Sequence, residues 1–289
     1  MRKRIKPPVA FILLGLPILI LVIAKSYAMF ARTVQLNAAK ATIPTVSTAP
    51  KNKTATSTEK EEAITSLDPI IDVSGWQLPE EIDYDTLSKN ISGAIVRVFG
   101  GSGIGIDNNA TNAKGVDKSY KKHIKEFQKR DVPVAVYAYV MGASVKEMKE
   151  EARILYKESK PYKPTYYWLD VEEKTMEDMN KGVEAFRSEL EKQGAKNIGI
   201  YIGTYFMEEH SISTDKFDAV WFPTYGTDSG YYEEDPNTSL NYDLHQYTSQ
   251  GYVDGFAKPL DLNQIASNKD IGSTYKKLFG RKPSKEAQE

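Results

Sequence analysis

Hydrophobic residues follow three different patterns along the chain. An uncharged, strongly apolar run extends from Pro7 to Ala24. Between about Arg32 and Ser66, Thr, Ala, Ser, Lys and Glu dominate, and no apolar period is sustained. After Leu67, short apolar segments recur with turn residues between them, which is the pattern of a folded domain. The chain therefore divides into an apolar N-terminal segment, a polar connecting segment and one folded domain.

The folded part contains eight short apolar segments that we predict to be β-strands. Several are nearly continuous in Val, Ile, Tyr and Trp, which is typical of strands covered on both faces in a parallel sheet. The predicted strands are 70–74, 94–99, 132–140, 166–172, 198–203, 219–225, 243–248 and 259–263.

Amphipathic segments that fit helices lie in the gaps between the early strands. One helix is predicted over 118–130. Ser144 and Glu147 form a capping box that opens a second helix, and a third is expected to open at 175–178 and to end at Gly194. The last three strands have no comparable helix between them. Strands and helices alternate in the first part of the domain, and the helices are missing between the last three strands. This pattern predicts an α/β fold, specifically an irregular βα barrel.

The N-terminal apolar run is preceded by four basic residues within positions 1–6. From Pro7 to Ala24 the run lies at the lower edge of the length that crosses a bilayer. If the span continues to residue 31, Lys25 and Tyr27 fall at the membrane interface, which suits both side chains. We therefore expect 1–6 in the cytoplasm, 7–31 as a transmembrane signal anchor, and the remaining chain outside the cytoplasm.

A cleaved signal peptide is the alternative interpretation of the same run. Ser26-Tyr27-Ala28 loosely fits a cleavage site with small residues. Cleavage near Ala28 would give a secreted protein rather than one held at the cell membrane. The apolar run is longer than most signal peptides contain, which favours the retained anchor.

The polar segment 32–66 is predicted to be a disordered linker. A flexible chain of about 35 residues reaches roughly 30 to 35 Å on average, which would hold a domain away from a membrane. The folded domain is expected to occupy 67–280, followed by a flexible tail at 281–289.

Composition excludes some classes of protein. The 289 residues include 38 Lys and Arg against 39 Asp and Glu, so the formal net charge is −1. No global positive field attracts nucleic acid. The chain has no Cys, which excludes disulfides and thiolate metal sites. Its three His residues are scattered and predict no metal site.

Two carboxylates, Asp170 and Glu172, interrupt the otherwise apolar fourth strand at a spacing of two. Residues at this spacing share one face of a strand. Enzymes with α/β barrels build their sites at the C-terminal ends of the strands. Crowded acids in a partly dry cleft leave one carboxyl protonated beside an ionised one, as glycosidases require. The alternative is an exposed strand end, with Glu173 and Glu177 as ordinary solvated acids.

Two further acids have a similar setting. Asp72 follows an apolar pair in the first predicted strand, and Asp261 follows Pro259-Leu260 in the last. If the barrel closes, the strands that carry these acids become neighbours. Asp72, Asp170, Glu172 and Asp261 at strand C-termini would then form one electronegative pocket.

Several short motifs follow one another in a fixed order along the folded part. They are Asp72-Val-Ser-Gly-Trp-Gln77, Ile82-Asp83-Tyr84, Val132-Pro-Val-Ala-Val-Tyr137, Leu169-Asp-Val-Glu172, Ile200-Tyr-Ile-Gly203, His245-Gln-Tyr247, and Val253-Asp-Gly255 running into Leu260-Asp-Leu-Asn263. From about Ile70 to Asn263, two thirds of the chain thereby resembles the glycoside hydrolase family 25 muramidases. The resemblance implies an irregular TIM-like (β/α)5(β)3 barrel, with helices after the first five strands only.

The resemblance also implies a role for each acid. Glu172 would be the general acid, and Asp170 would stabilise positive charge on an intermediate formed by the substrate's own N-acetyl group. Asp72 and Asp261 would orient these groups or bind sugar. This is a retaining, substrate-assisted mechanism; a direct carboxylate nucleophile is the alternative.

Aromatic residues on the predicted strands are candidates to line a glycan groove, although most aromatic residues of strands belong to the core. The candidate substrate-binding residues are Tyr137, Tyr201, Tyr225, Trp221 and Gln246. The chain departs from the family pattern at Ala138-Tyr139, at His245, and at Arg97-Val-Phe-Gly-Gly101. These departures leave the acids intact and concern the preference for particular sugars.

Together these features predict a peptidoglycan N-acetylmuramidase that hydrolyses the β-1,4 bond between N-acetylmuramic acid and N-acetylglucosamine. Its partners would be glycan strands and, through the N-terminal helix, the membrane. No metal or organic cofactor is expected, and no nucleic acid. One alternative is a non-catalytic peptidoglycan-binding or scaffold module of a cell-envelope or secretion apparatus. Another is hydrolysis of a different N-acetylhexosamine polymer, such as chitin.

Overall fold

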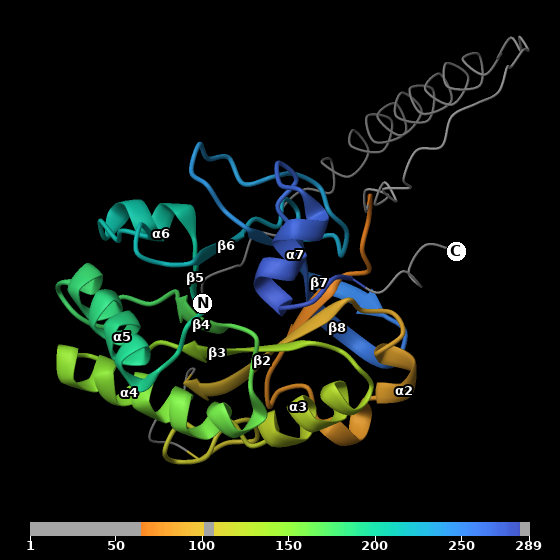
Figure 1. The fold of residues 1–289 in the computed structure, drawn as a ribbon, viewed down its shortest axis with the longest axis horizontal. Helices are drawn as coiled ribbons and strands as arrows, with labels where there is room; N and C mark the ends of the chain where they lie inside the picture. Colours follow the sequence, from red (N-terminus) through yellow and green to blue (C-terminus); the bar gives the residue numbers. More distant parts are fainter. Residues whose placement is uncertain (1–64, 101–106, 284–289) are drawn as a thin grey trace, which may run out of the picture. The chain divides into compact units, whose positions relative to one another are not determined.

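The computed structural model describes residues 65–100 and 107–283 (Figure 1). The predicted cytoplasmic segment 1–6, the anchor 7–31, nearly all of the linker 32–66 and most of the tail 281–289 lie outside the described residues. Among the helices of the described ranges, none combines the length and the apolar character that crossing a membrane requires. The anchor therefore stays a prediction.

Eight strands close into one barrel, and they follow one another around it in chain order. Neighbouring strands from β1 to β7 are parallel, whereas β8 is antiparallel to both β7 and β1. Each strand overlaps one predicted segment, so the predicted α/β barrel is confirmed. The strands are β1 (Ile70–Val73), β2 (Gly93–Gly100), β3 (Val134–Tyr139), β4 (Tyr167–Val171), β5 (Ile198–Ile202), β6 (Ala219–Pro223), β7 (Leu244–Val253) and β8 (Phe256–Ile265).

Helices follow the first five strands, as predicted. A further helix, α7 (Ile271–Phe279), follows β8, so the expectation that helices follow only the first five strands is wrong. In the described chain no helix lies between β6 and β7 or between β7 and β8. In Figure 1, α4 and α5 lie next to each other on the outside of the barrel. The helices are η2 (Pro79–Glu81), α2 (Tyr84–Leu87), α3 (Tyr120–Lys129), α4 (Val145–Ser159), η3 (Lys160–Tyr162), α5 (Met179–Gln193), α6 (Thr204–Glu209) and α7 (Ile271–Phe279).

The start of α4 pairs Ser144 with Glu147 as the predicted capping box does, but the reciprocal bond reaches the residue before the N-cap. The Ser144 hydroxyl accepts a hydrogen bond from the Glu147 backbone N–H at 3.3 Å. The Glu147 carboxylate in turn accepts one from the Ala143 backbone N–H at 2.8 Å. These bonds satisfy N–H groups that have no partner within a helix.

The start of α5 differs from the prediction of an opening at 175–178. The helix begins at Met179, because the Asp178 carboxylate caps it by accepting from the Lys181 backbone N–H at 2.9 Å. The Thr175 hydroxyl instead donates to the Gly142 carbonyl at 2.7 Å and joins two loops. The predicted end at Gly194 is confirmed, with a left-handed φ of 105°.

The last two strands form a longer hairpin than predicted. β7 and β8 have ten residues each and are joined by the turn Asp254-Gly255. Gly255 has a φ of 104°, and a Cβ at this position would lie 2.4 Å from the Leu87 nitrogen of α2. Its carbonyl accepts from the Asp83 backbone N–H at 2.8 Å. The turn thus packs closely on the N-terminal part of the domain, which only glycine allows.

The inside of the barrel is built in layers, because inward-facing residues recur every second position along each strand. The lower layer is apolar and buried, and the layer two residues further along the strands is mainly polar. The lower layer includes Ile70, Ile95, Ala135, Trp168, Ala219 and Leu244, and the upper layer includes Asp72, Arg97, Tyr137, Asp170, Trp221 and Gln246. The apolar core therefore ends where the polar site begins.

Candidate active site

A cavity of about 220 Å³ lies above the upper layer of the barrel. All four predicted acids and all five predicted substrate-binding residues line it: Asp72, Asp170, Glu172 and Asp261 with Tyr137, Tyr201, Trp221, Tyr225 and Gln246. Sequence reasoning missed five further lining residues, which are Ser74, Trp76, Gln77, Arg97 and Tyr139. The strands thus gather residues that are distant in sequence into one site.

Asp72 is a buried carboxylate with two amide donors. Its Oδ2 accepts from Gln246 Nε2 at 2.9 Å and from Asn263 Nδ2 at 2.8 Å. Burial raises the pKa of Asp72 to about 7, and the two hydrogen bonds partly offset this rise. Near neutral pH this group is poised between its two protonation states.

Asp261 reaches the cavity in a different way from that predicted. Because β8 runs antiparallel to its neighbours, Asp261 lies in the middle of its strand rather than at a strand C-terminus. It is paired in register with Asp72. Burial, followed by the charges of Asp72 and Glu172, raises the pKa of Asp261 to about 9. This carboxyl is therefore protonated at neutral pH.

Asp170 and Glu172 share one face at the end of β4, as their spacing predicted. Asp170 is only 7% exposed, and its Oδ1 is buried with no hydrogen-bond partner among the described residues. Burial and then the charge of Glu172 raise the pKa of Asp170 well above its usual value. Glu172 is exposed at the mouth, but the walls of the cleft displace enough water to raise its pKa as well. The pair therefore holds protons to a higher pH than isolated carboxyls would.

Gln246 connects two tyrosines to Asp72. Its Oε1 accepts from the Tyr201 hydroxyl at 2.8 Å and from the Tyr225 hydroxyl, while its Nε2 donates to Asp72. These contacts use both ends of the amide and fix its orientation. The indole of Trp221 packs edge-on against Tyr201 with ring centroids 4.6 Å apart. Trp221 is 2% exposed, so it contributes mainly to the floor.

The residues missed by sequence reasoning lie at the rim and on the floor. Trp76 is 52% exposed at the rim and belongs to the motif that begins at Asp72. Tyr139 lies two positions after Tyr137, and its hydroxyl donates to the Glu173 carboxylate at 2.8 Å. The strand period of two was a usable signal for Tyr139. For Arg97 the usable signal was a single charged residue within an apolar strand.

The arrangement suits proton transfer. Several carboxyls with raised pKa values face one small cavity, so a group that donates a proton can lie beside one that stays ionised. Within the described residues no group of three or more His, Asp or Glu side chains is arranged to hold a metal ion. The carboxyls and tyrosine hydroxyls that line the cavity are groups that can exchange protons with a bound substrate.

A sequence profile of the family described as "Glycosyl hydrolases family 25" matches residues 71–256. No match was found among the curated proteins.

Solved structures with the same fold include a glycosyl hydrolase 25 of Streptococcus pneumoniae, GHIP, described as a virulence factor participating in host cell invasion. It is 59% identical, with a TM-score of 0.72, over 74% of this chain and 93% of that one. The catalytic domain of endolysin ply40 from bacteriophage P40 of Listeria monocytogenes is 25% identical, with a TM-score of 0.64, over 75% of this chain and 100% of that one. A bacterial lysozyme from Streptomyces coelicolor shares the fold at 15% identity and a TM-score of 0.56, over 75% and 99%.

Proposed function

The chain belongs to the family 25 glycosyl hydrolases and is a glycoside hydrolase, and on this premise we propose that it hydrolyses peptidoglycan as an N-acetylmuramidase. Its target would be the β-1,4 bond between N-acetylmuramic acid and N-acetylglucosamine. The observation that carries the proposal is the meeting of Asp72, Asp170, Glu172 and Asp261 in one cavity. The endolysin and lysozyme among the similar structures support a cell-wall substrate.

In the proposed reaction, Glu172 protonates the glycosidic oxygen. It is the acid at the mouth, where a polymer has access, and its raised pKa keeps the proton available closer to neutral pH. Asp170 lies deeper on the same face. In its ionised form, which the charge of Arg97 favours, it would orient the N-acetyl group of the substrate and stabilise the positive charge that develops when the acetamido oxygen attacks the anomeric carbon.

The remaining acids would act on this pair and on the sugar. Asp72, held by two amide donors, would carry negative charge beside the developing oxocarbenium ion. Asp261, protonated at neutral pH because its pKa is about 9, would donate a hydrogen bond. Tyr137, Tyr201 and Tyr225 would contact the glycan. The N-acetyl group and then water would attack the anomeric carbon in succession. Because each attack inverts the configuration at that carbon, the product retains the configuration of the substrate.

The proposal is tested with purified peptidoglycan, the full-length protein and its Glu172→Gln variant. Released fragments are identified by mass spectrometry and by chemical reduction of their new ends. We expect reducing ends on N-acetylmuramic acid that disappear in the variant. Ends on N-acetylglucosamine would contradict the bond assignment. Cleavage of chitin fragments without cleavage of sacculi would instead identify a different N-acetylhexosamine polymer as the substrate.

No observation favours the alternative of a non-catalytic binding module. A pure binder has no need of four carboxyls with raised pKa values in one cavity, because removing water from each of their charged forms costs stability. Sacculus binding without release of fragments from several wall types would revive this alternative.

We further propose that the domain acts outside the cytoplasm, held at the cell membrane. The support is the basic start of the chain followed by the apolar run 7–24. Mass spectrometry of the membrane-extracted protein tests this. An intact N-terminus is expected, and a mature chain that starts near Met29 would show a secreted protein instead.

A further inference from the structure

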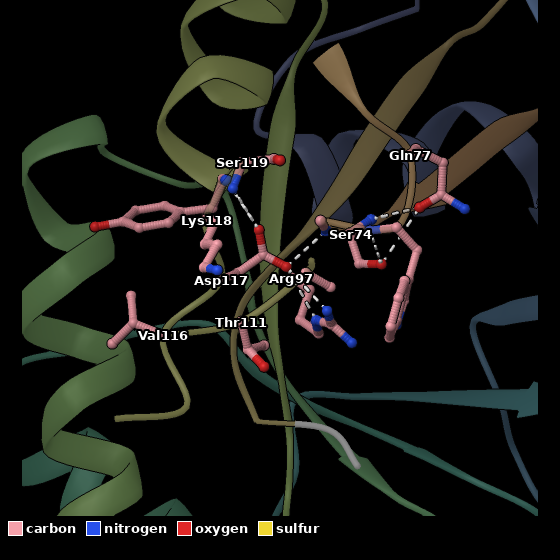
Figure 2. A network of polar contacts seen from close by, with 12 residues as sticks. Ser74, Gln77, Arg97, Thr111, Val116, Asp117, Lys118 and Ser119 are labelled. Carbon is pink, nitrogen blue, oxygen red and sulfur yellow. Dashed lines mark hydrogen bonds and ion pairs between the residues drawn. The ribbon is translucent and has the colours of Figure 1, made fainter. Parts of the chain in front are cut away.

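Asp117 joins three segments of the chain (Figure 2). It is 2% exposed. Its Oδ2 accepts from the Gly75 backbone N–H at 2.6 Å and from Arg97 Nε at 3.1 Å. Its Oδ1 accepts from the backbone N–H groups of Ser119 and Tyr120, which open α3. One carboxylate thus binds the turn after β1, the middle of β2 and the first turn of α3.

Arg97 extends from this carboxylate to the floor of the cavity. Of the described residues that line the cavity, only Arg97 carries a positive charge. Its Nη2 is 3.1 Å from Asp117 Oδ2, and both side chains are almost fully buried. A buried cation acts strongly on nearby carboxyls because little water screens it. The charge of Arg97 accordingly opposes the rise in the pKa of Asp170.

The turn 74–77 forms the rim on the side of β1, and buried groups fix it from two directions. Besides the bond from Gly75 to Asp117, the Ser74 carbonyl accepts from His123 Nε2 at 3.1 Å. The Tyr84 hydroxyl donates to the other ring nitrogen of this buried histidine at 2.7 Å. A Cβ at Gly75 would lie 2.4 Å from the Ala110 carbonyl oxygen, so the backbone of the turn packs directly against residue 110 and only glycine fits here. The turn carries Trp76, whose ring lines the cavity.

From these contacts we infer that Asp117 is a positioning residue for the hydrolysis: it holds the Arg97 guanidinium under Asp170 and holds the Trp76 turn at the rim. The inference rests on the proposed function of the site and extends it to a residue outside the cavity. Asp117 contacts neither the cavity nor a substrate in it. Its effect on the reaction is transmitted by Arg97 and by the turn.

The two members of the ion pair should affect Asp170 in opposite directions. Removal of the Arg97 charge takes a cation away from Asp170, so its anionic form becomes less stable and its pKa rises. Removal of the Asp117 charge leaves the Arg97 cation uncompensated, so the anionic form of Asp170 gains stability and its pKa falls. A purely structural role of the pair would produce no such opposite effect.

Several other ionisable groups face Asp170 and contribute to its titration in both variants. They are Asp72 on β1, Tyr137 and Tyr139 on β3, Glu172 after β4, Tyr201 on β5 and Asp261 on β8. Each of these groups is neutral when protonated and negative when ionised. Arg97 is the only cation among the described groups that line the cavity. The comparison between the two variants holds these neighbours constant.

The experiment uses the full-length protein with ¹³C-labelled Asp and follows the carboxyl signals by NMR as the pH changes, with Asp170→Asn to assign the signal. We expect Arg97→Met to move the Asp170 midpoint up by about one pH unit and Asp117→Asn to move it down by about as much. Arg97→Lys, which keeps the charge, should restore most of the wild-type midpoint. Asp243→Asn is the matched control, because Asp243, just before β7, is a buried carboxylate that pairs with Lys277 at 2.7 Å and does not line the cavity.

Kinetics on soluble glycan fragments separate the two tasks of Asp117. Asp117→Asn should raise KM about tenfold more than Arg97→Met does, because only the former releases the Trp76 turn. Equal KM values, or midpoints that shift in the same direction in both variants, would overturn the inference. Folding of Asp117→Asn is checked by near-UV circular dichroism. If this variant does not fold, the two Arg97 variants are sufficient for the test: equal Asp170 midpoints in Arg97→Met and Arg97→Lys would overturn the inference. The NMR titration requires no turnover, so an inactive wild-type protein would contradict the proposed function without affecting this test.

Discussion

Asp72 on β1 and Asp261 on β8 face each other in register across an antiparallel pair of strands. Both line the same cavity, and like charges directly opposite each other destabilise a sheet. The conflict is relieved when one of the two carries a proton. The pKa values of about 7 for Asp72 and about 9 for Asp261 express this preference.

The first prediction concerns stability against pH. A carboxyl whose pKa is higher in the folded protein than in the unfolded chain binds more protons in the folded state. Its stabilisation is therefore complete below a pH of about 4 and is lost as the pH rises through the folded value. For Asp261 this loss extends to a pH of about 9. We expect Asp261→Asn to flatten the fall in the urea midpoint between these limits, and an unchanged slope would contradict it.

The second prediction concerns Glu172. Its replacement by Gln should lower kcat by roughly 10²- to 10⁴-fold, the usual contribution of a general acid. Because Glu172 is exposed at the mouth, the melting temperature should change little. Glu177→Gln is the control, since Glu177 is an exposed acid in the same loop. Loss of activity in the control as well would mean that the loop, rather than the acid, is responsible.

The third prediction concerns Glu173, whose charge raises the pKa of Glu172. Glu173→Gln removes that charge, so the pKa of Glu172 falls and the alkaline limb of the kcat/KM profile moves to lower pH. Tyr139→Phe removes the hydrogen bond to Glu173 but leaves the charge. It should leave the limb in place. A shift of equal size in both variants would show that the contact, and not the charge, controls Glu172.

The fourth prediction concerns Gln246. Gln246→Met removes the acceptor of Tyr201 and Tyr225 and one of the two amide donors of Asp72. Buried polar groups left without partners cost about 1 to 3 kcal/mol each. We expect a lower free energy of unfolding and a higher pKa of Asp72, measured by denaturation and by carboxyl NMR. Gln246→Glu would not serve, because it adds a further charge beside Asp72.

The sequence predicted the parts of the site that depend on strand period and missed those that depend on direction or on distant contacts. A spacing of two was sufficient to bring Asp170 and Glu172 to one face. The pattern of a strand carries no information about its direction, so the antiparallel β8 and the mid-strand position of Asp261 were not foreseen. The extra length of β7 and β8 was missed because their outer halves are polar and partly exposed.

The contacts of Asp117 could not be predicted from its neighbourhood. Its partners Gly75 and Arg97 are 42 and 20 positions away. Asp117 itself precedes a helix, where an acid is usually explained as a cap. That explanation is correct for Oδ1, which accepts from Ser119 and Tyr120, and it leaves the second oxygen unexplained. The loop after β2 folds back along that strand, where the Asp117 backbone N–H donates to the Val98 carbonyl at 3.0 Å, and this return brings the second oxygen to Arg97.

The reversed direction of β8 has a practical consequence for attaching the domain to something else. Ile70 pairs with Asn263 near the end of β8, so the chain enters and leaves the barrel at the same rim. Tyr275 of α7 donates to the Ser92 carbonyl just before β2, at that same rim, whereas the cavity opens at the other one. A bead, dye or partner protein fused to either end of the barrel would therefore leave the mouth unobstructed, and immobilised domains could be presented to a whole sacculus with their catalytic side outward.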